Sequence, residues 1–214
     1  MTLRQHYDGK LEEIRSDILR MGSIASEMVR LAVEAALNGD IEVARRVVAM
    51  DDDVDELEKQ TVNNSVRLVA MEAPVAGDLR LLVATLGVIG EIEKVADDAV
   101  KLGRRATKLS GRFPAEMKLA LMELGEEVRK TFCAAMRLYT DFDPVMADEV
   151  VAGDEAIDGR YVEARNRVFE LIQKNPQDTE HLVRTIEAFH ALEHVADHAV
   201  EIACRLRMHN ETRQ

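Results

Sequence analysis

The sequence predicts an all-α protein: two similar three-helix bundles built from six long antiparallel helices and related by an internal duplication. Three observations predict this fold, namely a helix-favouring composition, apolar residues that recur every three or four positions, and a repeat between the two halves. Straight-chain residues are abundant and only 4% of the 214 residues are aromatic, which favours helices because such side chains lose little rotamer freedom there.

Turn-forming residues divide the chain into six segments. Their approximate bounds are 3–38, 40–73, 76–109, 113–140, 144–174 and 177–209. Apolar residues within them are spaced as on a helix face, as at Leu11, Ile14 and Ile18. All four prolines fall at the breaks, where helices tolerate them. Asp40 and Asp143 are predicted to cap the helices that follow them.

The two halves of the chain repeat each other. Met21–Asp55 aligns without gaps on Leu124–Asp158, and Asp78–Val100 aligns on Asp178–Val200. The repeat predicts two domains, residues 1–110 and 111–214, with a boundary near 110–113.

Acidic residues occupy matching positions in both halves. In each half, one helix carries two aspartates four residues apart and the next carries a glutamate followed by an aspartate at the same spacing. The eight acids are Asp51, Asp55, Glu93, Asp97, Asp154, Asp158, Glu193 and Asp197. A spacing of four places each pair on one helix face.

Antiparallel packing brings these pairs together, because residues at equal distances from a turn lie side by side. Asp55 and Glu93 are nearly equidistant from the turn near 73–75, and the second half has the same arrangement around Asn175–Pro176. Four converging carboxylates repel one another unless a cation binds them. The sequence therefore predicts one metal site in each bundle, for Mg²⁺, Mn²⁺, Ca²⁺ or iron, with Zn²⁺ also open.

Other polar residues near these acids receive simpler interpretations. Asp52, Asp53 and Asp98 have no repeat partner of the same type and are predicted to lie at the surface. His190, His194 and His198 recur every four residues, either as additional nitrogen ligands near the second site or as a half-exposed polar stripe. We favour the stripe, because the first half has Gly90, Lys94 and Asp98 at these positions.

The charge and the N-terminus restrict the partners and the location. A formal net charge of -12 disfavours nucleic-acid partners and attachment to anionic lipids. The stretch Met1–Asp8 has no apolar core of signal-peptide length, and no direct membrane insertion is expected. Cys133 and Cys204 form no CxxC motif and are predicted to be buried, reduced thiols. These features predict a cytoplasmic protein.

The stretch Pro74–Arg80, the motif Glu91–Asp97 and its echo Leu192–Asp197 resemble the signature of the PhoU family. The resemblance implies metal-ligand roles for the same eight acids through the family's E(D)xxxD motif. Family members often have Arg-Ile-Gly between the acids, whereas this chain has Lys94–Ala96 and His194–Ala196. The acids are retained, so the predicted ligand sets are unchanged.

The same resemblance implies regulation rather than catalysis. It implies a negative regulator of phosphate uptake and phosphate-starvation signalling that contacts the ATPase subunit of a phosphate ABC transporter and a sensor histidine kinase, and that forms a homodimer. One alternative is a ferritin-like di-metal oxidase, which requires two ExxH motifs, whereas the chain offers only Glu187–His190. The other is a metal-independent helical scaffold.

Overall fold

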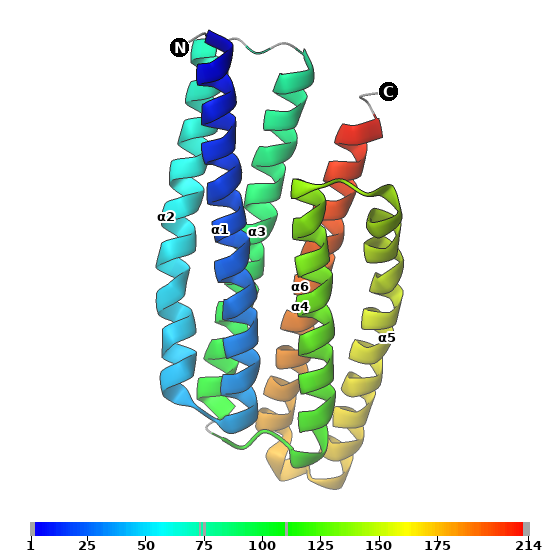
Figure 1. Ribbon diagram of the computed structural model, residues 1–214. Helices are drawn as coiled ribbons and strands as arrows, with labels where there is room; N and C mark the ends of the chain where they lie inside the picture. Colours follow the sequence, from blue (N-terminus) through cyan, green and yellow to red (C-terminus); the bar gives the residue numbers. More distant parts are fainter. Residues whose placement is uncertain (1–2, 73, 75, 110, 212–214) are drawn as a thin grey trace.

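The computed structural model describes residues 3–72, 74, 76–109 and 111–211, and these form six long α-helices and no strand. The helices are α1 (Leu3–Asn38), α2 (Ile41–Glu72), α3 (Ala76–Leu109), α4 (Lys118–Thr140), α5 (Pro144–Lys174) and α6 (Thr179–Glu211) (Figure 1). The predicted all-α fold is confirmed. Outside the described residues lie Met1 and Thr2 of the N-terminal segment, Ala73 and Val75 of the first predicted turn, and Ser110 at the predicted domain boundary.

Two helices begin later than predicted. A short 3₁₀ helix, Ala115–Met117, precedes α4, and another, Pro176–Asp178, precedes α6. Pro114 has an extended backbone (φ -57°, ψ 126°), so the α-helix cannot begin at 113 as the sequence suggested.

The predicted caps are present. Asp40 Oδ1 accepts hydrogen bonds from the backbone N–H groups of Glu42 and Val43, both at 3.0 Å. Asp143 accepts one from Val145 at 2.9 Å, with proline at the first helical position. Gly39 joins α1 to α2 in the left-handed region, with a φ of 69°.

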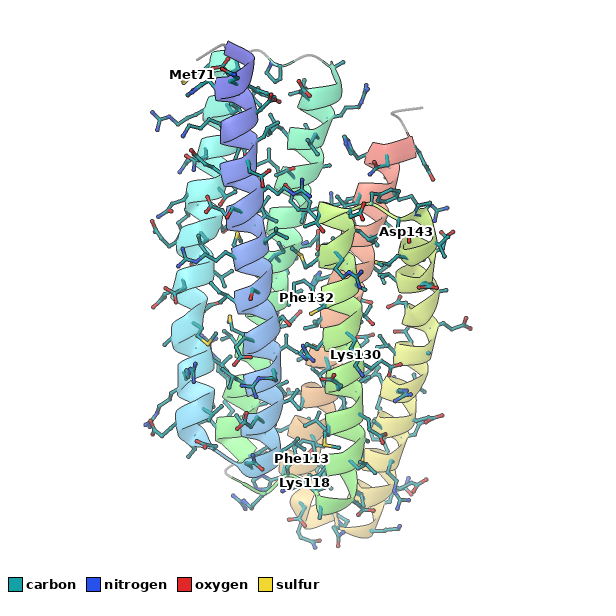
Figure 2. All side chains as sticks on the ribbon, in the orientation of Figure 1. Met71, Phe113, Lys118, Lys130, Phe132 and Asp143 are labelled. Carbon is teal, nitrogen blue, oxygen red and sulfur yellow. The ribbon has the colours of Figure 1, made fainter. Side chains whose placement is uncertain are left out.

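The two three-helix bundles lie side by side, and the helices that meet between them run antiparallel. Helices α1, α2 and α3 pack on one another, as do α4, α5 and α6, and α1 contacts α4 while α3 contacts α6 (Figure 1). Lys118 begins α4, and Asp143 caps α5 just beyond the other end of α4, which runs antiparallel to α1 (Figure 2). Lys118 Nζ donates a 2.6 Å hydrogen bond to the carbonyl oxygen of Leu37, which joins the two bundles near that end.

Two repeat-equivalent glycines allow α1 and α4 to approach closely. A Cβ added to Gly22 would lie 2.7 Å from Cε of Met136, and one added to Gly125 would lie 2.7 Å from Cγ2 of Val33. Both distances are shorter than a van der Waals contact, so the missing side chains provide space for the opposite helix. The duplication thus places a glycine on each side of the same interface.

Within the described residues, no helix combines the length and hydropathy needed to cross a bilayer. Cys133 and Cys204 are free thiols, but both are half-buried rather than fully buried, so the predicted degree of burial is wrong. Cys133 Sγ lies 3.4 Å from Ser26 Oγ.

Candidate metal centres

The first acidic cluster, formed by Asp51 and Asp55 of α2 and Glu93 and Asp97 of α3, is the looser of the two. Its acids influence one another's pKa, but within the described residues no three of them have carboxylate oxygens within 4.8 Å of one another. Partial burial raises the pKa of Asp51, and the neighbouring Asp97 and Asp55 raise it further. Burial likewise raises the pKa of Glu93, followed by the charges of Asp97 and Glu58. The mutual effects place all four carboxylates in one electrostatic environment.

Cationic side chains accompany this first cluster. Lys59 Nζ lies 3.3 Å from Asp55 Oδ2, and Arg104 partly offsets the rise in the pKa of Asp51. The pKa of Lys101 is raised, first by its hydrogen bond to Asp98 and further by the charges of the cluster. Part of the negative charge of the first cluster is therefore compensated by the protein itself.

The second acidic cluster, formed by Asp154, Asp158, Glu193 and Asp197, contains a tighter group. One carboxylate oxygen from each of its three aspartates lies within 4.8 Å of the others. Burial, Asp158 and Asp197 raise the pKa of Asp154. Burial and the three aspartates raise the pKa of Glu193 to about 7. The largest influences on these two acids are burial and neighbouring carboxylates, whereas Arg104 is among the largest influences on Asp51 in the first cluster.

Two carboxylate oxygens of the second cluster are buried without a hydrogen-bond donor among the described residues. They are Asp154 Oδ1 and Glu193 Oε2. Buried acceptors without partners are costly, and a cation would satisfy them. Oxygen donors that converge in this way fit hard cations such as Mg²⁺, Mn²⁺, Ca²⁺ or iron.

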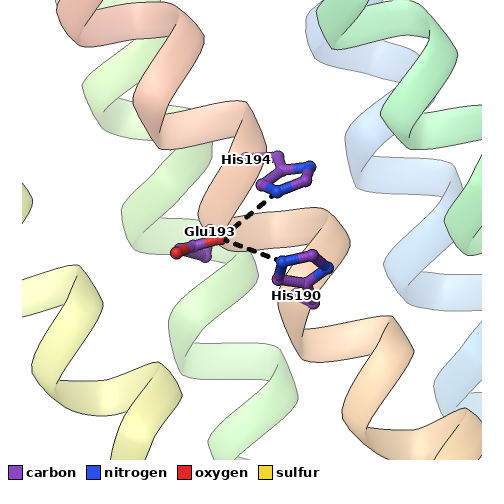
Figure 3. Close-up of side chains that lie close together, drawn as sticks. All are labelled: His190, Glu193 and His194. Atoms are coloured by element: carbon purple, nitrogen blue, oxygen red, sulfur yellow. Dashed lines mark ion pairs between the residues drawn. The ribbon is translucent and has the colours of Figure 1, made fainter.

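Glu193 also reaches a second set of side chains. Its Oε2 lies 3.8 Å from Nε2 of His190 and 3.8 Å from Nε2 of His194, and Figure 3 shows both interactions converging on this carboxylate. The two imidazoles are half-exposed, as the predicted polar stripe requires. Burial and the neighbouring His194 lower the pKa of His190.

The third histidine differs, because His198 lies in a buried ion-pair network at the α3–α6 interface. Its Nδ1 lies 3.0 Å from Glu91 Oε2 and its Nε2 lies 3.3 Å from Asp98 Oδ2. Asp98 is only 1% exposed, so its predicted surface location is wrong; Asp52 and Asp53 are exposed. The error arises because the cations that stabilise Asp98 in the interior include one from the other bundle.

Hydrogen bonds within this network keep its acids ionised. Burial raises the pKa of Glu91, but hydrogen bonds from Lys94 and His198 outweigh it and leave the pKa below its ordinary value. For Asp98, bonds from His198 and from Lys101 (2.7 Å) likewise outweigh burial and lower the pKa. Burial lowers the pKa of His198, and the two acids reverse this and raise it.

The chain matches a known protein family. The model of the PhoU domain matches residues 18–106 and residues 121–206, which together make up most of the chain. The chain belongs to the PhoU family. Each matched PhoU domain contains one complete acidic cluster, so the internal repeat is a repeat of the domain together with its candidate metal centre.

Relatives within the PhoU family extend over nearly the whole chain. The phosphate-specific transport system accessory protein PhoU homolog of Pseudomonas aeruginosa is 29% identical over 203 residues, 94% of this chain and 84% of that protein. The homolog of Clostridium acetobutylicum is 26% identical, over 93% of this chain and 91% of that protein.

Solved PhoU structures share the fold. The crystal structure of PhoU from Pseudomonas aeruginosa superposes with a TM-score of 0.92 and 27% identity, covering 96% of this chain and 99% of that chain. The phosphate transport system regulatory protein PhoU from Streptococcus pneumoniae gives a TM-score of 0.89 at 19% identity, over 96% of this chain and 97% of that chain, and shows the fold alone.

The burial of Glu91 and Asp98 is indicated by the row of residues on α3 in which they lie, although not by the spacing of the acids. Residues 88, 91, 95, 98 and 102 of α3 step alternately by three and four, as on a helix face that packs against another helix. Three of these residues are apolar and two are Glu91 and Asp98. An acid on an apolar row predicts a buried, paired carboxylate.

Proposed function

We propose that this PhoU-family chain is a cytoplasmic negative regulator of phosphate uptake and phosphate-starvation signalling. The observation that carries the proposal is the presence of two PhoU domains in a chain whose relatives, named as phosphate-specific transport accessory proteins, align with it almost end to end. An accessory protein acts through contacts, and we assign this chain no catalytic role.

The proposed contacts are with the ATPase subunit of a phosphate ABC transporter and with a sensor histidine kinase. Apolar side chains exposed near the α2–α3 turn support a protein partner: Val66, Met71, Leu79 and Val83 are all exposed there. Exposed apolar side chains that form a contiguous patch are typical of interaction sites, and these four lie on the two helices that the turn joins. The same argument supports a homodimer, and light scattering that gives a monomer mass near 24.0 kDa at micromolar concentration would contradict it.

Complementation tests the regulatory proposal. A bacterial strain that lacks its own PhoU and carries a phosphate-starvation reporter should regain repression in high phosphate when this chain is expressed. A reporter that stays fully active, with the protein present and folded, would overturn the proposal. Co-purification of the transporter ATPase or the histidine kinase from the chain's own source would identify the contact.

We further propose that the two acidic clusters bind divalent or trivalent cations. Mutual repulsion of the carboxylates, together with the donor-free oxygens of Asp154 and Glu193, supports binding. Metal analysis of protein purified without chelator tests this. Loss of metal from the double variant Glu93→Gln with Asp97→Asn would assign the first cluster, and an unchanged metal content would make those acids a solvated surface.

A further inference from the structure

We propose that His190, Glu193 and His194 form a third metal site, specific to the second bundle, that takes Zn²⁺ or a similar borderline transition metal. The site shares Glu193 with the second acidic cluster but adds nitrogen donors, which the acidic clusters lack. It does not depend on the regulatory role proposed above.

The donor atoms already lie close together. One ligand atom from each of the three side chains lies within 4.8 Å of the others, and the two contacts to Glu193 Oε2 are both 3.8 Å (Figure 3). Tetrahedral zinc with bonds of about 2.0–2.1 Å places its ligands roughly 3.3 Å apart. The two contacts to Glu193 would shorten by about half an ångström, and the separation between the two imidazole donors, at most 4.8 Å, by no more than about 1.5 Å. Histidines at i and i+4 are a common way for one helix to hold zinc.

A buried carboxylate lies behind one of the imidazoles. His194 presents Nε2 to Glu193, and its other nitrogen, Nδ1, lies 3.9 Å from Oδ1 of Asp98. Ligating histidines commonly donate from their second nitrogen to a carboxylate, and a shift of about 1 Å would bring His194 Nδ1 within hydrogen-bond distance of Asp98. Asp98 is held in place by Lys101 and His198. This carboxylate belongs to α3, so the arrangement forms only when the two bundles pack together.

The other imidazole is oriented by aromatic packing. The ring of His190 lies 5.6 Å from that of Tyr161 on α5 and 4.0 Å from that of His194. Zinc sites that keep one position for water typically have three protein ligands, and neutral imidazole and carboxylate are common among them. Imidazole also favours Zn²⁺, Ni²⁺ and Cu²⁺ over Mg²⁺ and Ca²⁺, which prefer oxygen.

The charge around the site favours a cation, and the repeat shows that the site belongs to the second bundle alone. Glu193 experiences the negative charges of Asp154, Asp158 and Asp197. The corresponding positions of the first bundle are Gly90 and Lys94, which offer no side chain and a cation. Two domains that share one fold thus differ in the metals that they can take.

Metal titration of chelator-treated protein tests the proposal. The parent should bind Zn²⁺, and Co²⁺ should give the absorption bands of a site with nitrogen ligands. The double variant His190→Ala with His194→Ala should lose one zinc equivalent and those bands, with its metal-free melting temperature nearly unchanged. His6→Ala, which removes an exposed histidine of α1, should behave as the parent.

A second variant separates this site from the acidic cluster. Asp154→Asn with Asp158→Asn should weaken Mn²⁺ binding and keep the zinc equivalent, because neither aspartate is a ligand of the proposed site. The proposal is overturned if the parent binds no zinc, or if the histidine variant retains the parent's zinc stoichiometry and Co²⁺ spectrum. Loss of zinc only in the aspartate variant would also overturn it.

Discussion

The two halves of this PhoU protein share a fold but differ in how they balance charge. In the first bundle, Lys59 and Arg104 lie near the acidic cluster. Repeat positions in the second bundle carry Val162 and Cys204, and its acids have imidazoles nearby instead. The first cluster is therefore partly neutralised by fixed protein charges, whereas the second depends more on titration or on bound cations.

The interface between the halves shows a second difference. Helix α3 contributes the buried anions Glu91 and Asp98, and α6 contributes His198 and Arg205, whose Nη2 lies 3.2 Å from Glu91. Since α3 and α6 are repeat equivalents, an exact duplication would place Asp98 opposite a second aspartate. Because the second half has His198 at that position, the interface is attractive rather than repulsive, and the difference between the halves makes the two helices complementary.

A substitution that restores the repeat at this interface should lower the melting temperature more than any other change considered below. His198→Asp makes the second half resemble the first and places three carboxylates together in the interior. Removing the partner of a buried charge costs about 3–5 kcal/mol, or roughly 6–20 °C in melting temperature for a chain of this size. His194→Lys also restores the repeat, but at a half-exposed position, and should change the melting temperature of metal-free protein by about 2 °C or less. Similar shifts for the two variants would contradict the network.

Chelation should separate the two acidic clusters. A metal at 100 times its dissociation constant stabilises the fold by about 2.7 kcal/mol, so chelator should lower the melting temperature by roughly 5–10 °C. Glu193→Gln with Asp197→Asn should abolish most of this response. Glu93→Gln with Asp97→Asn should abolish less, because cations already offset the first cluster. The responses are measured by thermal unfolding with and without chelator. Equal responses in the two double variants would mean that Lys59 and Arg104 do not reduce the stabilisation that metal gives the first cluster.

Most of the fold could be predicted from the sequence, because helical periodicity, prolines and caps are local. That the acids of each half influence one another could also be predicted, since counting outward from a turn fixes which residues face each other in an antiparallel pair. The tight approach of Asp154, Asp158 and Asp197, and the looser arrangement in the first half, could not. The burial of Asp98 could not be predicted in this way. Its partner His198 comes from the other bundle, and the acid spacing says nothing about which face of α3 meets α6.

The histidines show the same limit. Their spacing of four places them on one helix, but the sequence does not show how far each is buried. His198 points to Glu91 and Asp98 and is mostly buried, whereas His190 and His194 are half-exposed beside Glu193. Three equally spaced histidines thus have two different environments, which depend on the packing of α3 and α5 against α6.

The pH dependence of metal-free protein should report mainly on the second cluster. The pKa of Glu193 is about 7 in the folded state against an ordinary 4.5, so its favourable contribution is complete below about pH 4.5 and is lost as pH rises through 7. The melting temperature should therefore fall between pH 5 and pH 7.5. His198, with its raised pKa, acts in the same direction, while His190, with its lowered pKa, opposes it.

Glu193→Gln tests this assignment, because glutamine keeps the size and cannot ionise. The variant should be more stable than the parent at pH 7.5 without metal, and its melting temperature should vary less with pH. Glu93→Gln, in the first cluster, should flatten the profile less, since the rise in its pKa is smaller. A parent whose metal-free stability increases from pH 5 to pH 7.5 would contradict the assignment.

The smallest expected effect concerns Lys59, whose removal should make the first cluster resemble the second. Lys59→Val introduces the residue type found at the repeat position, Val162. The Lys59–Asp55 pair is exposed, so it is worth less than about 1 kcal/mol, and its loss should tighten Mn²⁺ binding at the first cluster by no more than about 5-fold. Calorimetric titration at low and high salt should show the gain in Mn²⁺ affinity shrinking as salt rises, because screening weakens exposed charge interactions.

Lys130→Val is the matched control, since Lys130 is similarly exposed on α4 and pairs with Glu126 rather than with either cluster (Figure 2). An equal gain in both variants would show that net charge, rather than the specific neighbour of Asp55, sets the affinity.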